Sequence, residues 1–218
     1  LSKAEVAARL PQLQGEFVGA LETPSDGQAE PFVAVPALAR AAQRLGVTII
    51  ENCAVRCVDK GAGHVMGVIT EQGRVACQKV ILAAGVWSGP FAANAGSNLP
   101  QLAVRSTVAR TEPVPDFMAS EGGTPNVSTG TLSIRRRLDG GYTVATGDVA
   151  EHYIGPPSFK YFTKFMPLMR KSGRDVRLRP WPLRGSPGAW TTARRWSADE
   201  VSPFERQRVL NPAPAPGV

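Results

Sequence analysis

The sequence is poor in the residues that build disulfide frameworks and metal sites. Its 218 residues include three cysteines and two histidines. Neither His64 nor His152 lies near a cysteine pair with the spacing of a zinc site. An odd, low number of cysteines argues against a disulfide framework and favours a reducing compartment. We therefore predict free thiols, no metal site and a cytoplasmic location.

Long apolar runs and two common enzyme motifs are also missing. No stretch of the sequence approaches 18 consecutive apolar residues, so we expect no transmembrane helix. No G-x-G-x-x-G follows a predicted strand, and no G-x-S-x-G is present, so neither a dinucleotide fingerprint nor a nucleophile elbow is visible. The catalytic residues are therefore unknown from the sequence.

Basic charge is concentrated near the end of the chain. The formal net charge is +7, and residues 170–208 hold ten Lys or Arg against four Asp or Glu. Such a region could bind nucleic acid, but its arginines are scattered among Pro, Trp and Gly without a known module. A basic surface that faces an acidic partner or a charged substrate explains the same pattern, and we favour it.

The first half of the chain alternates predicted helices and strands. Ser2 and Glu5 have the spacing of a capping box, and this first helix should end before Pro11. A second helix is predicted over residues 36–45, with Pro36 in its first turn and Gly46 after its end. The apolar run 47–50 then predicts a buried strand, as in α/β proteins whose sheet is covered by helices.

A meander of three strands is predicted next. Residues 54–58, 64–70 and 74–78 have strand composition, and short glycine-containing turns separate them. The apolar residues 79–82 predict one more strand, and a helix is predicted over residues 88–95.

The second half is predicted to contain antiparallel strands and two helices. A strand is expected over residues 104–111, and a hairpin is expected from residues 132–136 and 142–146, which flank an Asp-Gly turn. Helical composition recurs over residues 161–169 and 199–209.

The segment most suggestive of chemistry follows the run 79–82. There an apolar strand leads into Ala83-Ala84-Gly85, and Trp87-Ser88 opens the next helix. Small residues allow a ligand to approach the backbone closely, and N–H groups at a helix start can hold an anionic group. In open α/β sheets, ligands bind beyond the carboxyl ends of the strands. The pattern therefore predicts a ligand site here.

Five stretches in this order resemble the central part of the FAD-dependent D-amino-acid oxidase family, which includes glycine oxidase, sarcosine oxidase and D-amino-acid dehydrogenase. The most specific stretch is Ala83-Ala84-Gly85-Val86-Trp87-Ser88. The others gain weight from their order along the chain: residues 26–31, 39–55, 67–73 and 204–212.

The resemblance implies a mixed α/β fold divided into two domains. Residues 1–100 would be a partial Rossmann-like FAD-binding domain that includes the meander 54–78, and residues 101–218 an incomplete antiparallel-sheet substrate domain. The family's N-terminal G-x-G-x-x-G unit and its C-terminal segment have no counterpart in this sequence. We therefore expect the chain to be the middle of a longer enzyme, and to bind FAD weakly or not at all alone.

The resemblance also implies which residues contact the cofactor. Val55 would lie against the adenine end of FAD, while Ala83, Ala84 and Gly85 would line its ribityl-diphosphate part and Trp87 would pack beside them. The implied reaction is oxidation of the C–N bond of an amino acid or secondary amine: a hydride passes to flavin N5, and the imine is hydrolysed.

Two arginines are candidates for binding the substrate's carboxylate. Arg135 and Arg137 alternate with Arg136 along a predicted strand, so the first two share a face. The planar fork of a guanidinium matches a carboxylate. A solvated edge strand explains the same charges without a ligand, and we favour that interpretation.

Other functions stay open on the sequence alone. An FAD-dependent 2-hydroxy-acid or glycerol-phosphate dehydrogenase would share the cofactor scaffold, and fold analogy does not separate these reactions. A basic nucleic-acid-binding module and an inert relative of an enzyme are further alternatives. We expect a small-molecule amine or amino-acid partner and no nucleic acid. Peripheral contact with a membrane or a quinone, and the oligomeric state, are left open.

Overall fold

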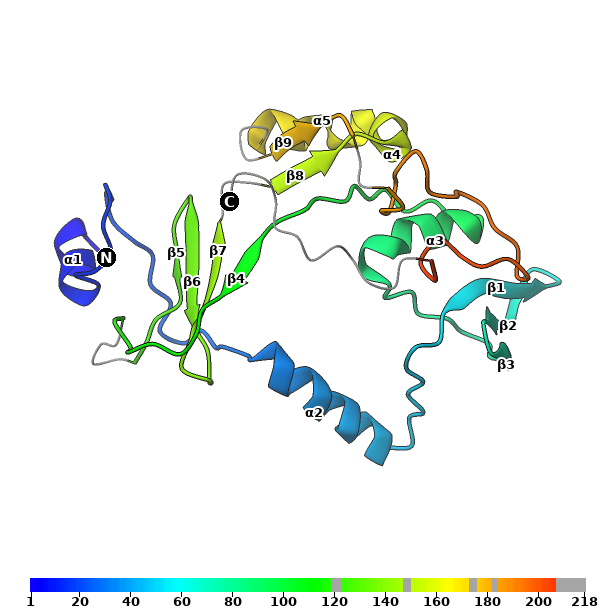
Figure 1. Cartoon of the computed structure of the whole chain (residues 1–218), viewed down its shortest axis with the longest axis horizontal. Helices are drawn as coiled ribbons and strands as arrows, with labels where there is room; N and C mark the ends of the chain where they lie inside the picture. Colours follow the sequence, from blue (N-terminus) through cyan, green and yellow to red (C-terminus); the bar gives the residue numbers. More distant parts are fainter. Residues whose placement is uncertain (119–122, 147–149, 173–175, 182–183, 207–218) are drawn as a thin grey trace. The chain divides into compact units, whose positions relative to one another are not determined.

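The chain forms two compact units, each built from two separate segments. The computed structural model describes residues 1–118, 123–146, 150–172, 176–181 and 184–206. The first unit comprises Leu1–Ile49 with Thr107–Gly147, and the second comprises Ile50–Ser106 with Asp148–Val218 (Figure 1). The expected domain boundary at residue 100 stays a prediction.

The first helix of the first unit has the predicted cap. In α1 (Lys3–Arg9), the Ser2 hydroxyl accepts the backbone N–H of Glu5, and the Glu5 carboxylate accepts that of Ser2. These two bonds satisfy donors that a helix start otherwise leaves free. The helix ends before Pro11, as predicted.

The second helix begins earlier than predicted. In α2 (Pro31–Arg44), Pro31 takes the first position, and Pro36 lies inside the helix. The carbonyl of Glu30 accepts the N–H groups of Val33 and Ala34, so the first turn closes ahead of Pro36. Pro36 fixes a helical φ and forgoes one hydrogen bond, which a short helix tolerates near its start. The predicted stop is confirmed, since Gly46 has a φ of +89°.

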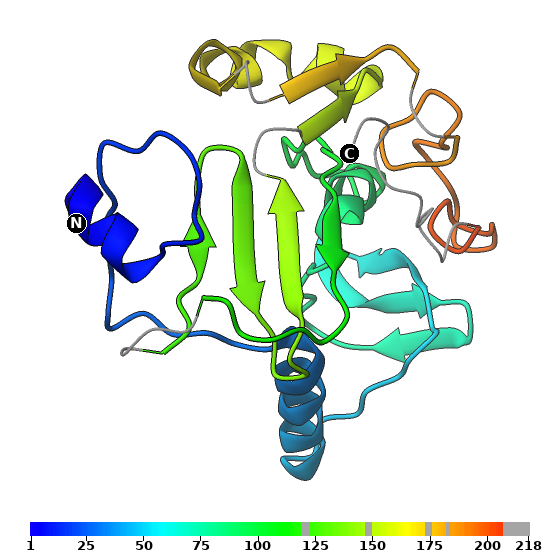
Figure 2. The same ribbon diagram turned by 60° about the vertical axis from the view of Figure 1, so that its left-hand side comes forward.

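A four-stranded antiparallel sheet completes the first unit, in the order β4-β7-β6-β5 (Figure 2). Its strands are β4 (Val108–Arg110), β5 (Val127–Ser128), β6 (Leu132–Arg136) and β7 (Tyr142–Thr146). The predicted hairpin is confirmed at the predicted bounds as β6 and β7. The expected strand over 104–111 shortens to β4, because Arg105 instead makes an isolated bridge with Glu151 in the second unit.

The second unit contains the predicted meander. Its strands β1 (Val55–Gly61), β2 (His64–Thr70) and β3 (Gly73–Ala76) pair antiparallel in chain order. A 3-10 turn, η1 (Gly85–Trp87), then leads into α3 (Ser88–Asn94), which confirms the helix predicted at Ser88.

The remainder of the second unit combines helices with a parallel strand pair. Its elements are β8 (Ala150–Tyr153), α4 (Pro156–Lys160), α5 (Phe162–Ser172) and β9 (Val176–Arg179), and β8 pairs with β9. The helix predicted over 161–169 is confirmed as α5, with Pro167 inside it. The helix predicted over 199–209 is wrong over 199–206, where the backbone forms bends and turns, and residues 207–209 lie outside the described residues.

Two predicted strands are absent from the described part of the chain. The runs 47–50 and 79–82 are not strands and have no ladder partner among the described residues. All their residues except the half-buried Val80 are exposed, and Ile81 retains 92% of its accessible surface. An apolar run indicates residues suited to burial, but a strand also needs a hydrogen-bonded neighbour. The fold is nevertheless of the predicted mixed α/β class.

Within the described residues, no helix is long and apolar enough to span a bilayer.

Candidate functional site

The second unit contains an open, mainly apolar pocket of about 600 Å³ beside the meander. Its walls come from the start of β1, from β2, from the segment after β3, from η1 and α3, and from a late turn. The lining consists of Ala54, Val55, Val68, Cys77, residues 79–84, Trp87, Phe91 and Phe204. A pocket of this size accommodates a small molecule or part of a dinucleotide.

Four of the five residues predicted to contact a cofactor line this single pocket. Val55 comes from the first residue of β1, Ala83 and Ala84 from the segment before η1, and Trp87 from the end of η1. Gly85 lies next to the wall rather than in it. A methyl group added at Gly85 would meet no atom within 4 Å, and its φ is +53°, which L side chains rarely adopt. The structure thus brings together residues separated by about thirty positions, while their role as cofactor contacts stays a prediction.

The turn at Gly85 is held by local hydrogen bonds. The N–H of Trp87 donates to the carbonyl of Ala84 at 3.0 Å. The Gln101 side chain bridges the turn and the following helix, because its amide donates to the carbonyl of Gly85 and its oxygen accepts the N–H of Gly89. These bonds fix the backbone where Ala83 and Ala84 face the pocket. Each of these alanines has a single methyl group, so little side-chain volume separates the pocket from the backbone.

Aromatic rings form another part of the lining. Phe204 packs edge-on against Trp87, with ring centroids 5.7 Å apart, and lies 6.5 Å from Phe91. It also packs edge-on against the buried Trp196 at 5.8 Å. Such contacts between rings are each worth about 0.5–1.5 kcal/mol beyond area burial. The cluster therefore gives the pocket a firm apolar wall.

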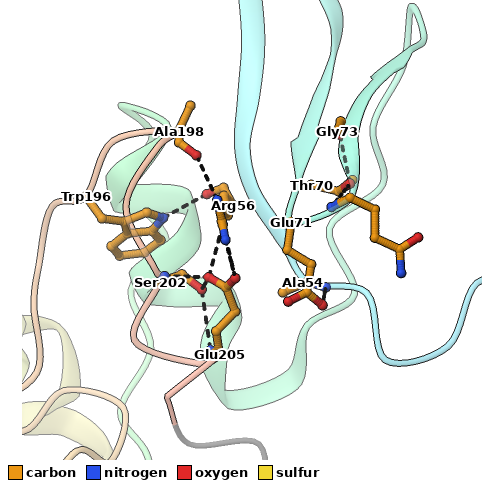
Figure 3. Close-up of polar contacts among 10 residues, drawn as sticks. Ala54, Arg56, Thr70, Glu71, Gly73, Trp196, Ala198, Ser202 and Glu205 are labelled. Carbon is orange, nitrogen blue, oxygen red and sulfur yellow. Dashed lines mark hydrogen bonds and ion pairs between the residues drawn. The ribbon is translucent and has the colours of Figure 1, made fainter.

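An ion pair behind this wall joins β1 to the late turn (Figure 3). The Arg56 guanidinium donates from Nε and Nη2 to Oε1 of Glu205 at 3.0 and 2.9 Å, and Nε also reaches Oε2 at 3.3 Å. The Glu205 side chain is 4% exposed and that of Arg56 is 19% exposed. Burial alone would raise the pKa of Glu205, but hydrogen bonds from Arg56 and Ser202 outweigh it and lower this pKa to about 2. Glu205 therefore stays charged near neutral pH.

The chemistry of the lining suits a flat aromatic ligand better than a metal ion. Lys79 is the only formally charged residue in the lining, and apolar side chains make up most of the rest. In the described residues, no group of three His, Cys, Asp or Glu could hold a metal. A ring system can stack on the aromatic wall and approach the backbone at Ala83 and Ala84, with Lys79 available to an anionic group. The residues present fit part of a flavin nucleotide.

The arginines predicted to bind a substrate carboxylate lie in the first unit and differ in their surroundings. Arg135 donates to the carbonyl of Ala29 at 2.8 Å and lies 3.7 Å from the Glu30 carboxylate. Arg137 is 6% exposed, and its guanidinium bonds Asp139 and two backbone carbonyls. Substrate binding by either arginine stays a prediction.

The sequence analysis did not identify the pocket residues that lie far along the chain from Val55. Phe204 lies 149 positions after Val55. Its stretch, residues 204–212, resembles the family, but no function was predicted for it. Phe91 was expected only as part of a helix, and Arg56 and Glu205 were not singled out. An aromatic residue in a late turn has no local signature that would reveal its contacts with Trp87 and Phe91, more than a hundred positions earlier.

The fold and the pocket together define an α/β protein with a site suited to a nucleotide cofactor. The profile of the family described as DAO, FAD dependent oxidoreductase, matches residues 1–199. The chain therefore belongs to this family of FAD-dependent oxidoreductases, which confirms the predicted resemblance.

Similar proteins include oxidases, dehydrogenases and deaminases of amino acids and amines. 4-Methylaminobutanoate oxidase (formaldehyde-forming) of Paenarthrobacter nicotinovorans is 38% identical over 126 residues, or 58% of this chain and 14% of the relative. Human mitochondrial sarcosine dehydrogenase is 32% identical over 146 residues, or 64% of this chain and 16% of the relative. The solved L-amino acid deaminase of Proteus vulgaris superposes with a TM-score of 0.77 at 27% identity, over 98% of this chain and 48% of the deaminase. The chain thus spans less than a fifth of these two curated relatives.

Proposed function

We propose that this chain forms part of an FAD-dependent oxidoreductase that oxidises the C–N bond of an amino acid or a secondary amine. The observation that carries the proposal is the single pocket that joins Val55 to Ala83, Ala84 and Trp87. Family membership supplies the cofactor class, and the relatives' names supply the substrate class.

Within this proposal, the pocket holds part of the flavin nucleotide. The wall at Ala83 and Ala84 allows the cofactor to approach the backbone, while Trp87 and Phe204 offer ring faces and edges for stacking. Gly85 keeps the turn open for the same approach, because its left-handed φ excludes most side chains. When bound, a flavin would supply the redox chemistry for the two-electron oxidation of the substrate's C–N bond, and hydrolysis of the imine would follow.

Arg135 is the better of the two arginine candidates for the substrate's carboxylate. Its side chain is 27% exposed, whereas Arg137 is 4% exposed and already bonded on three sides. A carboxylate could therefore reach the Arg135 guanidinium without breaking the hairpin. In this proposal Arg137 only stabilises the strand that carries Arg135.

We also propose a cytoplasmic location, which the three free cysteines fit.

A thiol-protection experiment tests the cofactor pocket without requiring activity. Cys77 lines the pocket, and Cys53 belongs to the same unit but lies outside the lining. The full chain would be alkylated with iodoacetamide at increasing FAD concentrations, and modification at each cysteine followed by mass spectrometry. We expect FAD to slow modification of Cys77 and to leave Cys53 unchanged. Because binding by this chain alone is expected to be weak, the titration should extend to millimolar FAD.

Parallel titrations identify which part of the cofactor the pocket holds. Protection by ADP would assign the pocket to the adenosine half, as predicted for Val55, and protection by FMN would assign it to the flavin half. Equal slowing of Cys53 and Cys77 would indicate a nonspecific effect, and unchanged modification of Cys77 at millimolar FAD would contradict the proposal.

A further inference from the structure

A partly buried ion pair lies next in sequence to two residues of the pocket wall. Val55 and Phe204 both line the pocket, and the next residue after each is a member of the pair, Arg56 or Glu205. Two hydrogen bonds of 2.9 and 3.0 Å join Arg56 to one carboxylate oxygen of Glu205, and its Nη1 also reaches the carbonyl of Ala198 at 3.4 Å. Two segments 149 positions apart are thus fixed to one another at the pocket.

The turn that presents Phe204 depends on the same carboxylate. Oε2 of Glu205 accepts the N–H of Ser202 at 2.5 Å and its hydroxyl at 2.6 Å, while the Ser202 hydroxyl accepts the N–H of Glu205 at 3.4 Å. Ser202 is fully buried, so no water replaces these bonds easily. The Glu205 carboxylate therefore holds the turn with one oxygen and Arg56 mainly with the other.

A second link runs through the backbone of Arg56. The Trp196 indole N–H donates to the carbonyl of Arg56 at 2.8 Å (Figure 3). The backbone N–H of Trp196 donates to the side chain of Asn94 at 3.1 Å. Trp196 also packs against Phe204. Trp196 therefore contacts strand β1, the end of α3 and the late turn that contains Phe204, and links the three segments.

We propose that Arg56 and Glu205 are positioning residues that hold the Phe204 wall at the distance from Val55 that a flavin nucleotide requires. This inference rests on the proposed function, because the pocket must be a nucleotide site. Neither Arg56 nor Glu205 lies in the lining, so both act through Phe204 and Val55 rather than through contact with the ligand. An ion pair is suited to this task because it is directional, whereas apolar packing alone allows the turn to shift.

The test compares FAD protection of Cys77 in four variants of the full chain. Arg56→Met and Glu205→Gln break the pair, Phe204→Leu keeps the pair but shortens the wall, and Arg74→Met is the matched control. Arg74 pairs with Asp59 at 2.7 Å on the same meander, outside the pocket. We expect the FAD concentration for half-protection to rise roughly tenfold in the first three variants and to stay within about twofold of wild type in Arg74→Met.

A melting curve without FAD separates positioning from a purely structural role. Lower melting temperatures in Arg56→Met and Glu205→Gln with unchanged half-protection, measured where both remain folded, would overturn the inference and leave the proposed function intact. If Arg56→Met does not fold, Phe204→Leu still decides, because half-protection equal to wild type would show that the wall position does not matter. Absence of Cys77 protection in the wild type would overturn the proposed function and this inference together.

Discussion

At the scale of single residues, the two candidate arginines, Arg135 and Arg137, differ in what surrounds them. Arg137 follows β6 and is buried, where it donates to Asp139, to the carbonyl of Thr111 at 2.9 Å and to the carbonyl of Tyr142 at 2.5 Å. Arg135 remains partly exposed. Alternation along the predicted strand does not indicate which guanidinium has its donors occupied.

Replacing Arg137 should destabilise the first unit more than replacing Arg135. In Arg137→Met the carbonyls of Thr111 and Tyr142 lose a buried donor, so we expect the free energy of unfolding to fall by about 2 kcal/mol. Arg135→Met serves as the control and should cost less than about 1 kcal/mol, because its ion pair is partly solvated. Urea unfolding followed by circular dichroism measures both. Equal losses in the two variants would contradict this account.

Glu205 should make the stability of the protein depend on acid. Its pKa is about 2 in the folded chain and close to 4.5 without its partners. A lowered folded-state pKa contributes stability that is complete above the unfolded pKa and is lost as the pH falls through the folded value. We therefore expect the difference in unfolding free energy between wild type and Glu205→Gln to be full above about pH 5 and to shrink between about pH 4.5 and 2. Urea titrations at neutral pH and at two acidic values check this, and a difference independent of pH would refute it.

At the scale of elements, the hairpins were predictable because their turn residues carry local signals. Asp139 accepts the N–H of Gly141 at 3.0 Å, and Gly140 has a φ of +85°, as an Asp-Gly turn requires. The turn between β1 and β2 likewise places Ala62 and Gly63 at positive φ. Short-range turn chemistry thus makes both hairpins predictable from the sequence, although the β1–β2 register also shifts at two positions along the strands.

Elements that depend on distant partners were not predictable in the same way. The runs 47–50 and 79–82 have strand composition, yet no described residue pairs with them. The candidate site shows the same division. Ala83, Ala84 and Trp87 lie in one short segment whose helix start at Ser88 was predicted, although the strand predicted before it is absent. Glu205 contacts Arg56 across 149 positions, and Phe204 packs against the distant Trp87 and Phe91. No local pattern encodes such contacts.

Gly67 tests how closely the meander strands pack. A methyl group added at Gly67 in β2 would lie 2.5 Å from the carbonyl oxygen of Val75, which is backbone and cannot move aside easily. We expect Gly67→Ala to destabilise the second unit by about 1–3 kcal/mol through overpacking. At Gly27 the same methyl would meet nothing within 4 Å. Gly27→Ala should therefore change the unfolding free energy little, and a similar loss in both variants would argue against close packing as the cause.

At the scale of the whole molecule, each compact unit is assembled from two stretches of chain that alternate along the sequence. The boundary at residue 100, which the family resemblance implies, treats each domain as continuous along the chain, and it stays a prediction. All four tryptophans, Trp87, Trp181, Trp190 and Trp196, belong to the second unit. Tryptophan fluorescence therefore reports on that unit, whereas circular dichroism reports on both.

This distribution of tryptophans allows the independence of the units to be measured. Each unit has its own sheet and its own buried side chains, Tyr142 in the first and Phe91 and Trp196 in the second. Compact units with separate cores unfold as separate cooperative steps unless a large interface couples them. We expect Gly67→Ala to lower the urea midpoint seen by fluorescence, and Arg137→Met to shift part of the circular dichroism transition while the fluorescence midpoint stays unchanged. If both variants moved both signals equally, the two units would unfold as one, and the chain would be a single cooperative domain despite its two clusters of contacts.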